Sequence, residues 1–211
     1  MAAVDEFDIT VKGKGGHAAS PHLAIDPVVI SAQVISAVQT IISRSTDPVD
    51  KALISITKIN AGTAYNVIDD QVKMGGTIRT FRRETRAYIE KRLNELCKGI
   101  ADAHGAEIKI EFDLVNKYPP TINSKEETKF AANVAKDLVG DDKVITDIDP
   151  SMGGEDFSYL LEKKPGSYLY LGQGDAEHSA HLHTTKYDFN DNLLPIGVNF
   201  WVDLVQKYFS K

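Results

Sequence analysis

The chain has few of the features that mark secreted or membrane proteins. Its one cysteine is Cys97, so no disulfide can form within the chain, and we expect a reducing, cytoplasmic setting. The first residues show no basic stretch followed by an apolar core, which argues against a signal peptide. No apolar run suggests a membrane span, so we expect no membrane partner.

Other absences restrict the chemistry. The formal net charge is −6, and no predicted strand interleaves basic and aromatic residues, so a nucleic-acid partner is not expected. There is no phosphate-binding P-loop and no Gly-x-Ser-x-Gly nucleophile elbow. Cys97 lies inside an apolar helical pattern, which makes it a poor nucleophile. What remains is an ordinary globular composition, with 42% hydrophobic and 26% charged residues.

The first half of the chain alternates strand and helix patterns. Apolar periodicity predicts strands at 6–13, 51–60, 70–82 and 106–114, and helices at 27–44 and 84–103. Asp26 and Pro27 are typical of a helix start, and Gly75-Gly76 suggests a bulge. We interpret Arg82, Arg83 and Arg86 as a solvated basic face. The order strand, helix, strand, strand, helix, strand predicts an α+β, ferredoxin-like βαββαβ domain with both helices on one face of an antiparallel sheet.

The second half follows a break at Tyr118-Pro119-Pro120, which suggests domains at 1–116 and 117–211. Ser124 to Glu127 reads as a capping box that opens a helix to about 139. Further elements are expected as short strands at 143–146 and 167–171 and helices at 155–163 and 194–209. With so few strands, this half indicates the end of a larger α/β sheet rather than an autonomous domain.

Histidines stand out in two loops. His17 follows three glycines and precedes Ala18, so its ring is free to donate a hydrogen bond outward; the alternative is an incidental histidine in a Gly-rich turn. His181 and His183 would share a face if they lie on a strand, and neutral imidazole is a common metal ligand. The alternative there is a polar surface loop.

Two further segments offer substrate contacts. Gly154 and Glu155 belong to a flexible, acidic helix start that we favour as a substrate-binding loop, although the acids also suit simple capping. Asn66 and Arg79 together offer an amide and a guanidinium to a substrate carboxylate. The alternative for Arg79 is a surface ion pair with Asp69 or Glu84.

Five motifs occur in one order along the whole chain. They are Gly-Lys-Gly-Gly-His-Ala-Ala-Ser-Pro-His at 13–22, Ala-Tyr-Asn-Val-Ile at 64–68, Gly-Thr-Ile-Arg-Thr-Phe at 76–81, Gly-Gly-Glu-Asp-Phe at 153–157 and His-Thr-Thr-Lys-Tyr-Asp-Phe-Asn-Asp at 183–191. The chain thereby resembles the aminoacylase/carboxypeptidase metallopeptidase family, in the amidohydrolase branch of hippurate and auxin-conjugate hydrolases. The resemblance implies a ferredoxin-like lid that dimerises, followed by the C-terminal portion of an α/β hydrolase domain that binds two metals.

The same resemblance implies roles for single residues. His17 matches the lid histidine that stabilises the oxyanion, commonly in the partner subunit's active site. Asn66 and Arg79 match lid residues near the substrate carboxylate or carbonyl. His183 matches a metal ligand, with His181 as the alternative. The implied substrates are N-acyl amino acids or short peptides with a free carboxylate, and the implied cofactor is a divalent metal (Zn, Mn, Co or Ni), two per complete site.

The chain also departs from the family. The segment that carries the other metal ligands and the general-base glutamate has no counterpart here, and Asp69 stands where the family usually has proline. We therefore expect metal to bind weakly or not at all, and the chain to be inactive without the missing N-terminal half of the catalytic domain. The alternative is a non-catalytic dimerisation and substrate-contact module, or a relic of a split gene.

Overall fold

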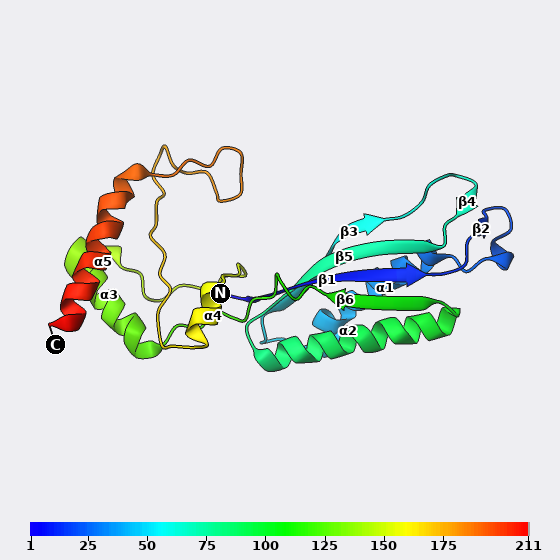
Figure 1. Cartoon of the computed structure of the whole chain (residues 1–211), viewed down its shortest axis with the longest axis horizontal. Helices are drawn as coiled ribbons and strands as arrows, with labels where there is room; N and C mark the ends of the chain where they lie inside the picture. The colour runs from blue at the N-terminus through cyan, green and yellow to red at the C-terminus, as the bar shows by residue number, and fades with distance from the viewer. Residues whose placement is uncertain (211) are drawn as a thin grey trace. The chain divides into compact units, whose positions relative to one another are not determined.

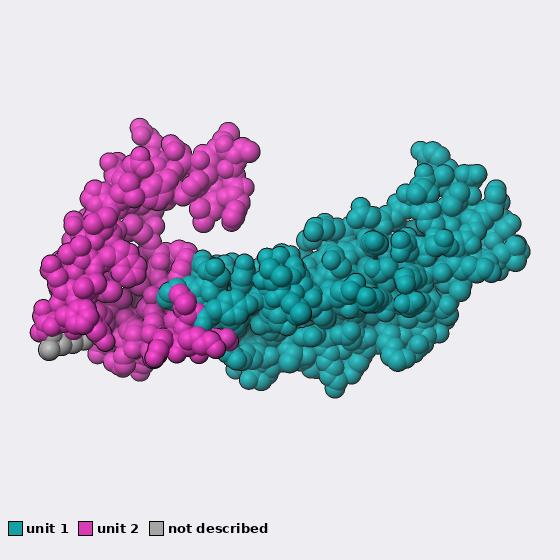
Figure 2. Space-filling view, viewed as in Figure 1, with its two compact units in different colours: residues 1–121, 150–159 teal, residues 122–149, 160–211 magenta. Residues whose placement is uncertain are grey.

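The computed structural model describes residues 1–210 and combines helices with sheet. The chain divides into two compact units (Figure 2). Unit 1 comprises residues 1–121 and 150–159, and unit 2 comprises residues 122–149 and the chain from 160 onward. The segment 150–159 thus packs with the first part of the chain, although it lies beyond the break that the sequence suggests at residue 117.

Unit 1 is built on a four-stranded sheet with the strand order β3-β5-β1-β6, in which all neighbours are antiparallel. The strands are β1 (Ala3–Lys12), β3 (Ala52–Asn60), β5 (Gln71–Thr80) and β6 (Glu107–Phe112). The helices α1 (Pro27–Thr40) and α2 (Arg83–His104) contact each other and cover one face of this sheet (Figure 1). The elements follow one another in the order that the sequence pattern predicted.

The core of unit 1 lies between the sheet and the two helices. Ile9 pairs with Met74 on one side and Ile110 on the other, so their side chains point to the same face. On the opposite face of β1, Glu6, Asp8 and Lys12 are exposed. The helices complete the core with Ile30, Val34, Val38, Ile41, Ile89 and Leu93, all of which are buried. The apolar side chains on one face of the strands and on one side of each helix therefore pack together in a single layer.

The ends of both helices follow the sequence signals. Asp26 accepts hydrogen bonds from the backbone N–H groups of Val28 and Val29, at 2.8 and 3.4 Å, and Gly105 ends α2 with a φ of 63°. Helix α1 continues as a π-turn over Ile41–Ser45. By length and composition the segment Pro27–Ser45 would suffice to cross a membrane, which corrects the expectation of no such run; its buried face packs in the core of unit 1.

The bulge lies on a different strand from the predicted one. The register between β3 and β5 shifts between Ile56 and Lys58, opposite Gly76 and Gly75, so the extra residue is Thr57 on β3. Gly76 remains in register with Phe7. A Cβ atom there would lie 2.3 Å from the Ser55 carbonyl oxygen, so the close strand approach explains the glycine.

A buried ion pair joins α2 to the centre of the sheet. Arg86 donates from Nε and Nη2 to the two carboxylate oxygens of Asp5, at 2.7 and 2.6 Å. The side chains are only 15% and 5% exposed, and Lys117 Nζ lies 3.7 Å from the same carboxylate. The interpretation of Arg86 as part of a solvated face is therefore wrong, whereas Arg82 is 67% exposed.

Unit 2 contains two long helices and much irregular chain. They are α3 (Lys125–Val139) and α5 (Leu194–Phe209), with 3₁₀ turns at Asp141–Lys143 and Asp191–Leu193. The boundary between the units, after Tyr159, lies within the short helix α4 (Phe157–Leu161). Ser124 does not cap α3 with its side chain, since its hydroxyl oxygen accepts from the Gly166 N–H at 3.1 Å. Neither strand predicted for this half, at 143–146 or at 167–171, forms.

We predict that Arg86→Leu destabilises the protein by about 3 kcal/mol, because it leaves the Asp5 carboxylate buried without its bidentate partner. Urea unfolding measured by circular dichroism tests this value. The matched control is Arg92→Leu, which removes a guanidinium of the same helix that is 38% exposed and should leave the midpoint almost unchanged. Equal losses in the two variants would contradict a special role for the Asp5–Arg86 pair.

Candidate functional site

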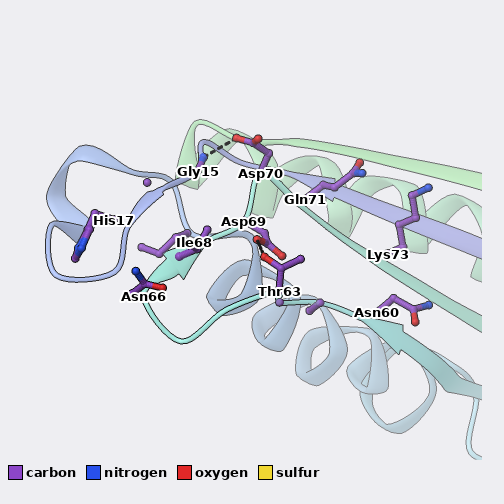
Figure 3. Close-up of a pocket in the computed structure, with 14 residues that line it drawn as sticks. Gly15, His17, Asn60, Thr63, Asn66, Ile68, Asp69, Asp70, Gln71 and Lys73 are labelled. Atoms are coloured by element: carbon purple, nitrogen blue, oxygen red, sulfur yellow. Dashed lines mark hydrogen bonds between the residues drawn. The ribbon is translucent and has the colours of Figure 1, made fainter.

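Two short strands at one end of unit 1 carry two of the predicted site residues. Strand β2 (Gly16–His17) pairs with β4 (Val67–Ile68), with His17 opposite Val67. The pairing continues beyond the strands, because the Ala18 N–H donates to the Asn66 carbonyl oxygen at 3.0 Å. We call this β2–β4 pair the ribbon. It places His17 and Asn66 on neighbouring segments, both exposed (Figure 3).

The imidazole of His17 has a defined tautomer when neutral. The backbone N–H of Ala19 donates to His17 Nδ1 at 3.1 Å, so Nδ1 must be the unprotonated ring nitrogen. The proton of the neutral ring then resides on Nε2. In this arrangement the hydrogen-bond donor of the neutral ring is Nε2–H, and the role of His17 in binding or catalysis stays a prediction.

The ribbon borders an open hollow of about 900 Å³ within unit 1 (Figure 3). Its lining includes His17 and Asn66 together with Asn60, Thr63 and Gln71. These side chains offer several hydrogen-bond donors and acceptors around an accessible space, beside the apolar side chains of Val67 and Ile68.

Arg79 and Gly154 lie together at the other end of the same sheet. The register pairs Arg79 with Val4 and Leu53, at the end of β5 remote from Gln71. A Cβ atom on Gly154 would lie 3.3 Å from Arg79 Nη1 and 2.0 Å from Val4 Cγ2. This loop is tied to β1, because the Ala2 N–H donates to the carbonyl oxygens of Ser151 and Gly153.

The same end of unit 1 also carries Glu155, whose carbonyl oxygen accepts from Thr121 Oγ1 at 3.5 Å. One chain therefore brings Arg79, Gly154 and Glu155 to one place and His17 and Asn66 to another. At about 3.3 Å per residue, the eight steps along β5 from Gln71 to Arg79 separate the two places by roughly 26 Å. A single chain does not let Asn66 and Arg79 hold one carboxylate together.

His183 lies in a turn of unit 2. Its φ is 62°, and it has the only positive φ of any non-glycine residue in the part of the chain that the structure describes. Thr184 Oγ1 donates to the His181 carbonyl oxygen at 2.8 Å, which closes the turn. His181 and His183 therefore do not lie on a strand, so the condition under which they would share a face is not met. Positive φ is uncommon for residues other than glycine, although histidine adopts it more often than most.

Hydrogen bonds between side chains close the base of the loop that carries His181 and His183. The sequence did not indicate these contacts as a group. Asn190 Nδ2 donates to Asp175 Oδ2 at 3.0 Å and to the Gln173 carbonyl oxygen at 3.3 Å. Tyr187 Oη donates to Gln173 Oε1 at 3.1 Å. Asp175 Oδ1 lies 2.9 Å from His178 Nδ1. In the sequence, only the i, i+3 spacing of Asp175 and His178 indicates that these two side chains could contact each other.

These contacts shift two pKa values in opposite directions. The backbone N–H and then the ring of His178 donate to Asp175 and lower the pKa of its carboxyl group. The hydrogen bond to Asp175 raises the pKa of His178, and the negative charges of Asp188 and Glu177 act in the same direction. Both shifts favour the charged pair.

The structure also bears on metal binding and on the reactivity of Cys97. Within residues 1–210, no three His, Cys, Asp or Glu side chains gather closely enough to hold a metal ion, so the described residues do not by themselves fit a metal centre. Cys97 is buried, and desolvation raises the pKa of its thiol to about 11. That value agrees with the prediction that Cys97 is a poor nucleophile.

Residues 5–207 match the family model described as peptidase family M20/M25/M40. The chain belongs to this family. It is 38% identical over 210 residues to the hippurate hydrolase of Campylobacter jejuni, covering 100% of this chain and 54% of that protein. It is 34% identical over 204 residues to the N-acetylcysteine deacetylase of Bacillus subtilis, covering 97% of this chain and 52% of that protein.

A solved structure of the M20 family gives the same result in three dimensions. A Bacillus subtilis protein described as a dinuclear metal-binding peptidase superposes with a TM-score of 0.73 at 30% identity, over 97% of this chain and 49% of its own. The relatives are hydrolases, as the motifs predicted. The chain spans about half the length of the curated relatives it matches.

We predict that Gly154→Ala destabilises unit 1 by about 1–3 kcal/mol, because the new methyl group would overlap Val4. The matched control is Gly99→Ala in α2, where no atom lies within 4 Å of the added Cβ and helix propensity should increase stability by roughly 0.5–1 kcal/mol. Thermal unfolding of both variants measures the difference. A stabilised Gly154→Ala variant would show that the 151–155 loop does not pack on β1.

Proposed function

We propose that this M20-family chain is part of a metal-dependent amidohydrolase that cleaves N-acyl amino acids or short peptides with a free carboxylate. In this proposal residues 1–116 are the ferredoxin-like lid and residues 117–211 close the catalytic domain. The named activities of the relatives support this substrate class. We propose that the other half of the catalytic domain supplies the remaining metal ligands and the general base.

The single observation that carries the proposal is the donor geometry of His17. The Ala19 N–H donates to Nδ1, which leaves the Nε2–H of the neutral ring as the donor that His17 offers, and His17 lines the same hollow as Asn66. A fixed donor of this kind stabilises the negative charge on the oxygen of a tetrahedral intermediate, an effect of roughly 3–4 kcal/mol in comparable sites. Because the donor is oriented before substrate binds, little reorganisation is needed.

The remaining site residues take supporting roles in the proposal. His183 supplies one ligand to a divalent metal (Zn, Mn, Co or Ni), and its left-handed backbone favours it over His181. In a complete enzyme such metals activate water and polarise the scissile carbonyl. Arg79, Gly154 and Glu155 of a second copy contact the substrate bound beside His17. The free, buried thiol of Cys97 supports a cytoplasmic setting.

Exposed apolar surface in unit 2 supports the need for a further half. No residue of α5 is buried, and Val198, Trp201 and Val205 are 51–63% exposed along one side of the helix. Leu169 and Leu171, in the segment predicted as a strand, are 40% and 51% exposed. Such surface in a soluble protein marks an interface. We propose that the missing half of the catalytic domain covers it.

We expect residues 1–211 alone to be inactive, and activity to appear when a chain supplying the other half is co-expressed with them. The half can be taken from the Campylobacter jejuni relative, and release of glycine from N-benzoylglycine is measured with added zinc, manganese or cobalt. In the complemented enzyme, His17→Ala should lower kcat by roughly 10²–10³-fold, because one oxyanion donor is lost. The neighbouring His22→Ala is the control and should retain activity.

Hydrolysis by the isolated chain would refute its proposed dependence on another half. An unchanged kcat in His17→Ala would refute the oxyanion role. A second candidate function is a non-catalytic dimerisation and substrate-contact module, favoured by the lack of a three-ligand cluster among residues 1–210. Binding of N-acyl amino acids by a complemented but inactive protein would support that alternative.

We also propose a homodimer formed through unit 1. Strand β3 is an edge of the sheet, and Ile59 on it and Val29 on α1 are 56% and 53% exposed. Pairing of two β3 strands would extend the sheet across a twofold axis. A second copy would also offer its Arg79 end to the His17 end of the first, which one chain cannot do for itself.

Light scattering after size exclusion tests the dimer. We expect a mass of two chains for the unsubstituted protein and a shift toward one chain for Ile59→Asp, which places a charge on the edge strand. The control Ile145→Asp changes a residue that is 76% exposed in unit 2 and should not alter the lid association. A monomer at all concentrations would refute the proposal.

A further inference from the structure

We propose that Asp70 is a positioning residue for His17, and that its neighbour Asp69 positions the loop of Asn66. The inference rests on the proposed function, in which His17 and Asn66 face the reacting carbonyl. Neither aspartate lies in the ribbon itself. Both follow β4 directly, at the point where the chain turns into β5.

Asp70 contacts the glycine segment that leads to His17 through both its backbone and its side chain. Its carbonyl oxygen accepts from the Gly13 N–H at 2.8 Å, and its Oδ1 accepts from the Gly15 N–H at 2.8 Å (Figure 3). The next pair along the chain is Gly16 with Ile68, followed by His17 with Val67. Asp70 therefore sets the register from which the position of His17 follows.

The contact between the Gly15 N–H and the Asp70 carboxylate requires glycine at position 15. A Cβ atom on Gly15 would lie 2.8 Å from Asp70 Oδ1 and 2.9 Å from the Ile68 carbonyl oxygen. Either contact would push the segment away from β4. The glycine lets the backbone approach closely enough for its N–H to reach the carboxylate.

The ribbon needs such support because it is short. Only Gly16–Ile68 and His17–Val67 are paired as strands, and an isolated two-stranded ribbon is marginal in water. A hydrogen bond to an ionised carboxylate is stronger than one between neutral groups. A carboxylate at the base of the ribbon is thus well suited to limit the motion of a loop rich in glycine.

Asp69 forms a hydrogen bond within the other segment of the site, the loop that carries Asn66. Its Oδ1 accepts from Thr63 Oγ1 at 2.8 Å, and the Val67 N–H donates to the Ala64 carbonyl oxygen at 3.3 Å. These bonds close the loop that carries Asn66. The side-chain bond from Thr63 thus restrains the loop between Thr63 and Asp69.

The test uses NMR of the full chain with Asp70→Ala and Asp70→Asn. In Asp70→Ala we expect the Gly15 amide to exchange with solvent at least roughly tenfold faster, since a hydrogen bond to a charged group is lost. The ring ¹⁵N shifts of His17 should move toward an average of both tautomers as the Ala19 contact loosens. Asp70→Asn should restore most of both signals, because the amide Oδ1 still accepts.

Asp102→Ala is the matched control, because the Asp102 carboxylate pairs with Lys98 on the exposed surface of α2, and this variant should change neither signal. A scalar coupling across the Gly15 N–H···Asp70 hydrogen bond in the unsubstituted chain tests the contact without any variant. Absence of that coupling would overturn the proposal. So would unchanged His17 ring shifts in a folded Asp70→Ala chain.

None of these signals depends on turnover, so they separate this inference from the proposed function. In the complemented enzyme, Asp70→Ala should lower kcat with little change in KM, and Asp70→Asn should recover kcat. Loss of order at His17 without any loss of kcat would overturn the positioning role. If no complemented enzyme is active, the proposed function fails, whereas the NMR result still decides whether Asp70 orders His17.

Discussion

The long antiparallel pairing of β1 with β5 is the constraint on which the rest of unit 1 depends. It runs in unbroken register from Ala3–Thr80 to Lys12–Gln71, so each end of the sheet is fixed relative to the other. The ribbon continues from one end, and the Gly154 loop packs on the other. Because neither strand can slip by one residue without turning its apolar face to solvent, the two groups of site residues keep their separation.

The sequence predicts unit 1 well where the signal is local. The Asp26 cap, the Gly105 helix end and the alternation around Ile9 each involve residues close together in the chain, and all three are found in the structure. Arg86 was misread because its environment is not local. Its partner Asp5 lies 81 positions away, so only the packing of α2 on the sheet makes the arginine buried.

In unit 2 the predictions fail where an element needs a partner. A helix satisfies its own backbone, and the helix predicted at 194–209 is found as α5. A strand needs a neighbour, and the segment 167–171 finds none among residues 1–210, although its apolar pattern is that of a strand. Unit 2 therefore forms helices α3 and α5, whereas its segments 143–146 and 167–171 form no strand.

The two histidines of the proposed site, His17 and His183, differ in the same way, because only one of them depends on groups outside its own unit. His17 receives its tautomer from the Ala19 N–H and its place from pairing with Val67, so contacts within unit 1 suffice to prepare it as a donor. His183 has a distinctive backbone but stands in no cluster of three possible metal ligands among the described residues. Hydrogen-bond donation needs one oriented group, whereas metal binding needs several convergent ones. The order of the ribbon around His17 therefore depends on contacts within unit 1 alone, whereas a metal centre would need ligands beyond those that the described residues bring together.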